Sequence, residues 1–138
     1  PRIAELVGRH DRIHLVDPLP YEQFVAAMKA AHLIVSDSGG VQEEAPALRK
    51  PVLVIREETE RSEAVTAGVA KLIGANAETV RKEVKLLLTD ADAYAMMARG
   101  ASPYGDGAGA ARIVDALEAY LGVKPRRDMP DWAYEDSR

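Results

Sequence analysis

Short apolar runs alternate along the chain with longer stretches in which apolar residues recur at helical spacing. The runs at 12–16, 32–36, 52–55 and 69–73 are bounded by turn residues and predict strands. The run at 52–55 is apolar throughout, which is typical of a parallel strand that is buried on both faces.

Residues that favour a helix end follow several of the helical stretches. Pro51 disfavours helical geometry in the residue before it, and Gly68, Gly100 and Gly122 are natural helix stops. Asn76 can accept hydrogen bonds from the first free amides of the helix that follows it. The predicted helices cover 21–30, about 40–50, 61–67, the stretch after Asn76, 90–99 and 110–121.

In two of these helices, the spacing of apolar residues predicts which side chains are buried. Apolar residues three or four positions apart share one helix face, and that face is expected to pack on the sheet. In the helix after Asn76 the face holds Val80, Val84, Leu87 and Leu88. In the last helix it holds Ile113, Val114, Leu117 and Leu121.

The alternation of strands with helices predicts an α/β fold, a doubly wound parallel sheet of the Rossmann-like kind with helices on both faces. We expect one domain over residues 1–122. The remainder, 123–138, is polar, contains Pro125 and Pro130, and shows no periodicity, so we expect a tail there.

Composition narrows the class of protein further. With 47% hydrophobic and 29% charged residues, the 138-residue chain is typical of a soluble globular domain. The net charge of −4 without a basic block predicts no nucleic-acid partner, and no apolar run approaches the roughly 20 residues of a membrane helix. Cysteine is absent and the histidines lack ligand spacing, so we expect no metal site. The chain begins with Pro1 and reads from its first residues as the middle of a helix, so we expect a piece of a longer protein.

The sequence Ser-Asp-Ser-Gly-Gly-Val-Gln-Glu-Glu-Ala-Pro at 36–46 marks the junction between a strand and a helix. Ligands of open α/β sheets bind at such carboxyl ends of strands. Gly39 and Gly40 allow the backbone to approach an anion, the first helical amides point at it, and Ser38 adds a hydroxyl. This chemistry suits a diphosphate. The alternative is an ordinary turn in which Ser38 or Asp37 caps the helix. The Gly-x-Gly-x-x-Gly and P-loop patterns are absent.

Glu44 lies about one helical turn beyond these glycines. A carboxylate beside an anion site is unfavourable unless it accepts hydrogen bonds, and the vicinal hydroxyls of a ribose are suitable donors. The alternative is a surface carboxylate that stabilises the helix N-terminus, a role equally natural for Glu43.

The segments 36–46, 50–56 and 59–64 together resemble the C-terminal domain of the non-hydrolysing UDP-N-acetylglucosamine 2-epimerases. The segments 17–24 and 103–107, with Arg112 and Ile113, fit the same family. The resemblance implies one half of a two-domain fold of the glycosyltransferase-B type, in which this domain binds most of the UDP. It implies no cofactor.

The resemblance also assigns roles to single residues. Backbone groups near Leu19 would read the uracil edge and Phe24 would stack on the ring, although Phe24 could also be a core residue. Arg61 would reach the sugar and diphosphate, or else pair with nearby acids at 57, 58 and 60. The UDP contacts implied are Leu19, Phe24, Ser38, Gly39, Gly40, Glu44 and Arg61. Gln42, Arg56 and Glu60 have no role that the sequence assigns.

The family inverts C2 of UDP-GlcNAc to give UDP-ManNAc, by elimination of UDP and its re-addition to a 2-acetamidoglucal. This route needs acid and base groups and a site that stabilises the departing diphosphate. This chain would supply the last, with Arg61 as its catalytic candidate. The acid and base carboxylates are implied in a preceding domain, so we expect the chain alone to be inactive. We further expect a UDP-sugar ligand, a cytoplasmic location, and a possible homodimer of the full-length protein. A hydrolysing relative, a UDP-sugar glycosyltransferase domain and a non-catalytic nucleotide-binding module remain alternatives.

Overall fold

The chain forms two compact units, residues 1–30 and residues 31–138. The computed structural model describes residues 2–7, 10–99, 102–127, 129 and 132. The first unit holds helix α1 (Arg2–Val7) and helix α2 (Tyr21–Ala30), and α2 spans the range that the sequence predicts.

The strand predicted at 12–16 is wrong. These residues are not in a strand, and Ile13, Leu15 and Val16 are 44%, 57% and 68% exposed. A strand is stable when a neighbouring strand pairs with its backbone and an apolar layer covers one face. The described part of the first unit contains no other strand, so the apolar pattern has no partner there.

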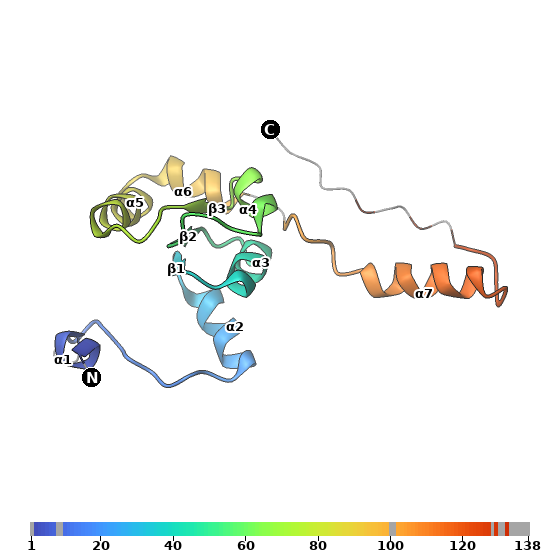
Figure 1. The fold of residues 1–138 in the computed structure, drawn as a ribbon, viewed down its shortest axis with the longest axis horizontal. Coiled ribbons are helices and arrows are strands. Elements are labelled where there is room, and N and C mark those ends of the chain that lie inside the picture. The colour runs from blue at the N-terminus through green and yellow to red at the C-terminus, as the bar shows by residue number, and fades with distance from the viewer. Residues whose placement is uncertain (1, 8–9, 100–101, 128, 130–131, 133–138) are drawn as a thin grey trace. The chain divides into compact units, whose positions relative to one another are not determined.

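The second unit is built on a three-stranded parallel sheet with the strand order β1-β2-β3 (Figure 1). Its strands are β1 (Ile34–Ser36), β2 (Val52–Val54) and β3 (Ala70–Leu72), each inside an apolar run of the sequence. The central strand β2 is fully buried, as its unbroken apolar sequence predicts.

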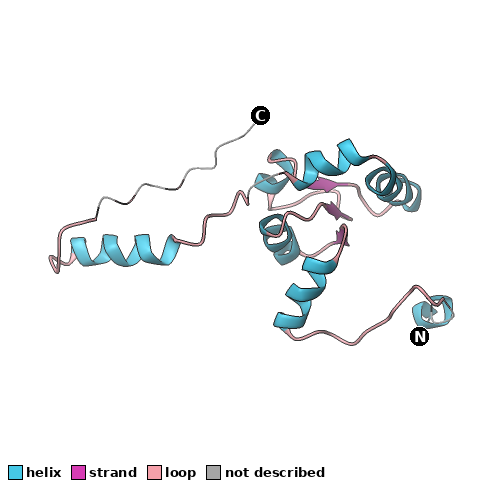
Figure 2. Cartoon of the chain, turned by 180° about the vertical axis from the view of Figure 1, so that it is seen from behind, coloured by secondary structure: helices cyan, strands magenta, loops and turns pink. Residues whose placement is uncertain are grey.

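Helices flank this sheet on both sides (Figure 2). Helix α3 contacts β2 and α4, α4 contacts β3, and α5 contacts β2 and α6. The predicted α/β class with a parallel sheet is therefore confirmed. The helices of the second unit are α3 (Gly39–Ala47), α4 (Ser62–Thr66), α5 (Ala77–Thr89), α6 (Ala91–Ala98) and α7 (Gly109–Tyr120).

The core between the sheet and the α5–α6 pair centres on Leu53 of β2. Leu53 packs with Ile73 and Leu87. The prediction that Leu88 shares this buried face is wrong, because Leu88 is 61% exposed. It follows Leu87 directly, and neighbouring positions on a helix point about 100° apart. Partly buried residues complete the cluster: Leu33, Ile55, Val80, Val84, Ala93 and Met97.

Local sequence signals explain most helix ends. Asn76 Oδ1 accepts hydrogen bonds from the amides of Glu78 and Thr79 at 2.9 and 3.1 Å, as predicted for a cap. Gly68 and Gly122 follow α4 and α7 with φ of 72° and 69°, a left-handed geometry that glycine adopts without strain. The predicted stop at Gly100 lies outside the described residues.

Helix α3 ends at Ala47 rather than near Lys50. Arg49 adopts a left-handed φ of 56°. The amides of Arg49 and Lys50 then turn back and donate to the carbonyls of Pro46 and Ala45, at 2.9 and 3.1 Å. These bonds satisfy the last carbonyls of the helix, the closure that glycine usually provides.

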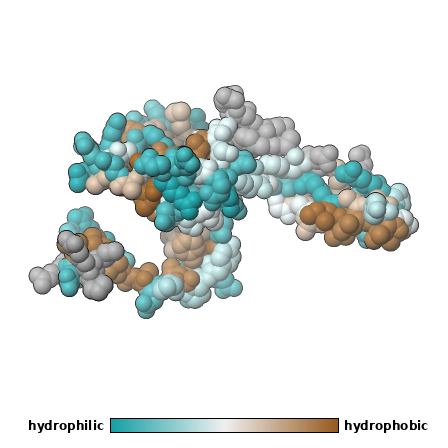
Figure 3. Space-filling view, viewed as in Figure 1, coloured by the Kyte–Doolittle hydropathy of each residue, from teal (hydrophilic) through white to brown (hydrophobic). Residues whose placement is uncertain are grey.

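The predicted burial on α7 is wrong. Ile113, Leu117 and Leu121 are 62%, 54% and 69% exposed, and Val114 is 51% exposed. Figure 3 shows an apolar stripe along this helix. The buried residue of α7 is instead Asp115, which accepts hydrogen bonds of 3.0 Å from both the backbone amide and Nε of Arg127. The helix is amphipathic as predicted, but the described residues do not cover its apolar face.

The boundary predicted between a domain at 1–122 and a tail at 123–138 stays a prediction. No helix in the described part of the chain is long and apolar enough to cross a membrane.

Candidate functional site

The turn between β1 and α3 lies at the carboxyl edge of the sheet. β1 ends at Ser36, and α3 begins at Gly39 with Ser38 in the N-cap position. The Ser38 side chain makes no capping hydrogen bond, so the alternative of a side-chain cap by Ser38 is not seen. The Ser38 amide donates instead to Ser36 Oγ at 3.1 Å. The first amides of α3 have no acceptor within the helix, and they face the same point as the positive end of its dipole.

The glycines of this turn are not required by the backbone. Neither Gly39 nor Gly40 has a positive φ, unlike Gly68. A Cβ added to Gly40 would meet nothing nearer than Ser38 Oγ at 3.9 Å, and one on Gly39 would lie 3.1 Å from the flexible Glu60 carboxylate. The fold thus tolerates side chains at both positions. What the glycines provide is open access to the amides.

Glu44 is half-buried on α3, four residues after Gly40. Its Oε2 atom is buried and has no hydrogen-bond partner within the described structure. An unpaired buried carboxylate oxygen costs free energy, on the order of 1–3 kcal/mol or more for a charged group. The geometry therefore does not support the alternative of a solvated surface Glu at this position.

Arg61 stands at the start of α4 and faces α3. Its Nε donates to Glu43 Oε1, and its Nη1 lies 3.5 Å from Glu60 Oε1. Of the acids expected to pair with Arg61, Glu60 does so, and it also binds Arg56 at 3.1 Å. The guanidinium is close to the turn as well, with Nη2 3.8 Å from the Cβ position of Gly39. The hydrogen bond with Glu43 raises the pKa of Arg61 above its usual value.

A buried polar group connects the turn with the Arg61 loop. Gln42 is fully buried on α3, and its Nε2 donates to the Ser38 carbonyl at 3.3 Å. Thr59 Oγ1 donates to Gln42 Oε1 at 2.6 Å and accepts from the Arg61 amide at 3.0 Å. The same loop receives a long hydrogen bond of 3.5 Å from the Tyr104 hydroxyl to the Arg61 carbonyl.

Burial and hydrogen bonding shift two further pKa values at this edge. Partial burial raises the pKa of the Tyr104 hydroxyl above its usual value. A hydrogen bond from its own backbone amide, with help from Arg56 and Arg61, lowers the pKa of Glu60. The site thus places Arg61 between the carboxylates of Glu43 and Glu60.

The structure brings together Ser38, Gly39, Gly40, Glu44 and Arg61 in the second unit. Leu19 and Phe24 belong to the first unit, so the geometry of this edge does not bear on them. Phe24 is 38% exposed and Leu19 37% exposed, which does not support a core role for Phe24. The uracil contacts assigned to these two residues stay predictions.

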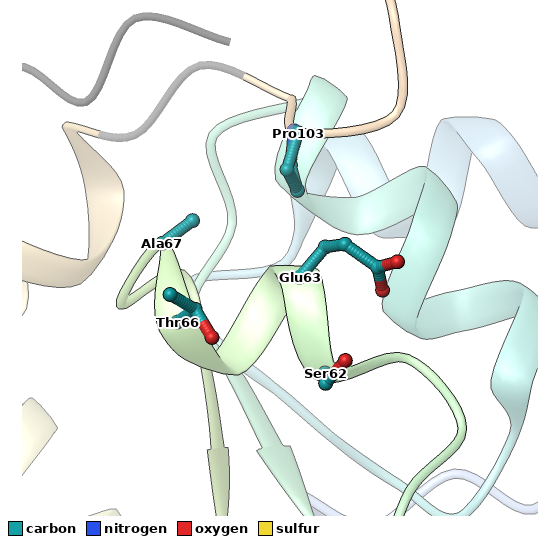
Figure 4. Close-up of a pocket in the computed structure, with 5 residues that line it drawn as sticks. All are labelled: Ser62, Glu63, Thr66, Ala67 and Pro103. Carbon is teal, nitrogen blue, oxygen red and sulfur yellow. The ribbon is translucent and has the colours of Figure 1, made fainter.

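A shallow pocket of about 210 Å³ lies beside α4. Its lining comes from one side of α4 and from Pro103 (Figure 4). None of the predicted UDP contacts lines this apolar pocket, so the pocket is not part of the predicted UDP site. Its residues are Ser62, Glu63, Thr66, Ala67 and Pro103.

The described residues contain no group of three or more histidine, aspartate or glutamate side chains that could hold a metal ion. His32 instead stacks on Tyr94 with ring centroids 4.1 Å apart, and the Tyr94 hydroxyl donates to the His32 carbonyl at 3.0 Å. This histidine therefore connects α6 to the start of the sheet.

Sequence reasoning missed how Gln42, Thr59 and Glu43 take part in the site. A weak signal was present for Gln42, which lies next to Val41 and three residues before Ala45, both buried. A polar residue within an apolar helix face indicates an internal hydrogen-bond partner. The identity of that partner, 17 residues away, was not readable from spacing.

Comparison with known proteins supplies independent information. The family model described as UDP-N-acetylglucosamine 2-epimerase matches residues 1–118. The UDP-N-acetylglucosamine 2-epimerase of Bacillus subtilis is 45% identical over 135 residues, which cover 95% of this chain and 35% of that protein. The chain thus spans about a third of the length of this relative.

Solved structures show the same likeness. The Staphylococcus aureus MnaA–UDP co-structure matches 94% of this chain and 35% of its own, with 42% identity and a TM-score of 0.86. A Neisseria meningitidis UDP-GlcNAc 2-epimerase bound to UDP-GlcNAc matches 83% of this chain and 31% of its own, with 43% identity and a TM-score of 0.79. These matches confirm the predicted fold class.

Proposed function

Because the chain belongs to the UDP-N-acetylglucosamine 2-epimerase family, we propose that it is the UDP-binding part of an enzyme that converts UDP-GlcNAc to UDP-ManNAc. The reaction proposed is elimination of UDP from the sugar, followed by its re-addition to the opposite face. The S. aureus relative was solved with UDP and the N. meningitidis relative with UDP-GlcNAc, which supports a UDP-sugar as the ligand here.

The unpaired carboxylate oxygen of Glu44 is the observation that carries this proposal. It lies one helical turn from Gly40, beyond the free amides at the start of α3. A nucleoside diphosphate matches this arrangement, because its phosphates accept from the amides while its ribose hydroxyls donate to the carboxylate. A ligand with a negative charge but no hydroxyl groups would repel the Glu44 carboxylate and would leave its Oε2 atom without a hydrogen-bond donor.

Arg61 is the proposed catalytic residue of this chain. When UDP leaves the sugar, negative charge grows on its β-phosphate. A guanidinium and a helix N-terminus at that point stabilise the developing charge more than they stabilise the bound sugar nucleotide. Arg61 is close to the Gly39 backbone and stays protonated, so its position and charge suit this role.

We propose that the chain is part of a longer protein, whose remaining part supplies the acid and base groups and covers α7. The exposed apolar stripe of α7 supports a protein partner, because Ile113, Val114 and Leu117 together form a surface that water solvates poorly. In thermal unfolding, replacing Leu117 with aspartate is expected to destabilise the full-length protein more than the 138-residue chain, in which Leu117 is 54% exposed. The cytoplasmic location and the homodimer stay predictions.

The reaction is tested by incubating the natural full-length polypeptide with UDP-GlcNAc and identifying the products by NMR. UDP-ManNAc as the product supports the proposal. UDP with free ManNAc would instead indicate a hydrolysing enzyme. Transfer of the sugar to an acceptor would indicate a glycosyltransferase. Binding without turnover would indicate a non-catalytic nucleotide-binding module. The 138-residue chain alone is expected to show no turnover.

A further inference from the structure

Gln42 is a polar side chain with no exposed surface, in a helix whose other buried residues are apolar or small. Burying an amide is unfavourable unless its donors and acceptors are paired. Gln42 meets this requirement by bonding in two directions, to the Ser38 carbonyl through Nε2 and to the Thr59 hydroxyl through Oε1.

The Thr59 hydroxyl continues this connection. It has one proton, which it gives to Gln42 at 2.6 Å, and its lone pair accepts from the Arg61 amide at 3.0 Å. An unbroken path of hydrogen bonds therefore runs from the carbonyl of Ser38 to the backbone of Arg61. We call this path, formed by Gln42 and Thr59, the Gln42–Thr59 relay.

We propose that the Gln42–Thr59 relay positions Arg61 relative to the Ser38–Gly40 turn, and thereby sets the affinity of the site for the diphosphate. This inference rests on the function proposed above and adds two positioning residues to it. Neither side chain is proposed to touch the ligand, because Gln42 is fully buried and Thr59 uses its hydroxyl within the relay.

The need for such a relay follows from where Arg61 lies. Arg61 is the N-cap residue of a five-residue helix, and the loop before it is exposed at Glu57 and Glu58. A short helix and an exposed loop position a side chain poorly by themselves. The buried amide of Gln42 connects this loop to α3, the helix that carries the turn, so that the guanidinium and the amides form one anion site.

Thr59→Val and Thr59→Ser form a matched pair for testing the relay. Valine keeps the shape of threonine but cannot donate to Gln42, whereas serine keeps the hydroxyl. In the natural full-length polypeptide, we expect Thr59→Val to weaken UDP binding by about fivefold, the loss of affinity that corresponds to the free energy of one ordinary hydrogen bond. Thr59→Ser is expected to bind UDP like the wild type. Uridine, which lacks the diphosphate, is expected to bind all three proteins equally.

The same Thr59→Val change made in an Arg61→Ala protein shows whether its effect on UDP affinity depends on Arg61. In Arg61→Ala protein, the added Thr59→Val change is expected to cause no further loss of UDP affinity, because there is no guanidinium left to position. A loss of the same size in both backgrounds would overturn the proposal. Equal weakening of UDP and uridine by Thr59→Val would also overturn it, since this would indicate general damage to the fold.

Amide hydrogen exchange tests the relay without any ligand. Thr59→Val is expected to speed exchange at the Arg61 amide while leaving the amides of β2 unchanged, and Thr59→Ser is expected to preserve the wild-type rate. An unchanged Arg61 rate in Thr59→Val protein would contradict the relay. If the wild type binds no UDP while exchange responds as expected, the proposed function fails and the relay remains as a connection between loop and turn.

Discussion

Arg61 and Glu43 form an ion pair that joins the start of α4 to the first turns of α3. Glu60 lies on the other side of the guanidinium, 3.5 Å from Nη1. The cation that we propose to bind the diphosphate is therefore already paired with carboxylates of the protein. In the proposed complex, the negative charge of UDP would lie beside these two carboxylates, so we expect them to oppose UDP binding.

Removing one carboxylate is expected to strengthen UDP binding. Glu43→Gln keeps a hydrogen-bond acceptor for Arg61 and removes the charge. We expect a gain of a few-fold in UDP affinity, since a partly exposed ion pair contributes only about 0.5–1 kcal/mol. The gain should shrink at high salt. Calorimetry measures it, with Glu63→Gln as a control that changes the net charge equally but not the Arg61 pair. Equal gains in both variants would show a general charge effect instead.

Gly40→Ala is expected to separate stability from binding. The added Cβ finds open space and an ordinary helical backbone, so the free energy of unfolding should rise, by up to about 1 kcal/mol. The same methyl group blocks the approach of a phosphate to the amides, so UDP affinity should fall at least tenfold. Gly109→Ala is the matched control, because Gly109 lies in the first turn of α7 as Gly40 does in α3, and nothing lies within 4 Å of its Cβ position. If Gly40→Ala binds UDP as well as the wild type, the phosphates do not lie at this turn.

Glu44→Gln is expected to impair recognition of the ribose alone. The neutral amide removes a charge from a buried oxygen that has no partner within the described structure, so stability at pH 7 should stay level or rise. UDP affinity should fall about tenfold, the value of charge-assisted hydrogen bonds. With 2′,3′-dideoxy-UDP as the titrant, wild type and variant should bind equally. A variant that loses affinity for both ligands would contradict ribose binding by Glu44.

The Asp106–Arg112 pair predicts a pH dependence of stability. Two hydrogen bonds of 2.8 and 2.7 Å from Arg112 hold the pKa of Asp106 well below its usual 3.8. A lowered pKa in the folded state stabilises the protein at pH values above the unfolded pKa, and this contribution is lost as the pH falls below it. Asp106→Asn should therefore be less stable than the wild type at pH 7, and the difference should narrow below pH 3.8. Urea unfolding at pH 7 and pH 3 measures both differences, and a gap that stays constant would contradict this account.

Much of the fold was predictable because apolar runs and capping residues act locally. The strands at β2 and β3, the helix α2 and the cap at Asn76 follow from neighbouring residues. The errors at 12–16 and on α7 share a different cause. An apolar pattern shows that a segment needs a partner, but it does not show whether that partner is present in the same chain.

In the site, too, contacts between residues close together in the sequence were predictable, whereas contacts between distant segments were not. Ser38, Gly39 and Glu44 lie on consecutive turns of one helix start, so their spacing was enough to suggest an anion beside a carboxylate. The contacts of Arg61 with Glu43, and of Thr59 with Gln42, join segments 18 and 17 residues apart in the sequence. Only the packing of α4 against α3 brings them together.

Titration of uridine, UMP and UDP into the wild-type full-length polypeptide tests the central claim most directly, namely that the Ser38–Gly40 turn and Arg61 hold a diphosphate. Calorimetry should show affinity rising with each phosphate, with the larger part of the binding free energy supplied by the diphosphate. Equal affinities for uridine and UDP would contradict the claim, because they would show that the free amides of α3 and the guanidinium of Arg61 do not contact the phosphates.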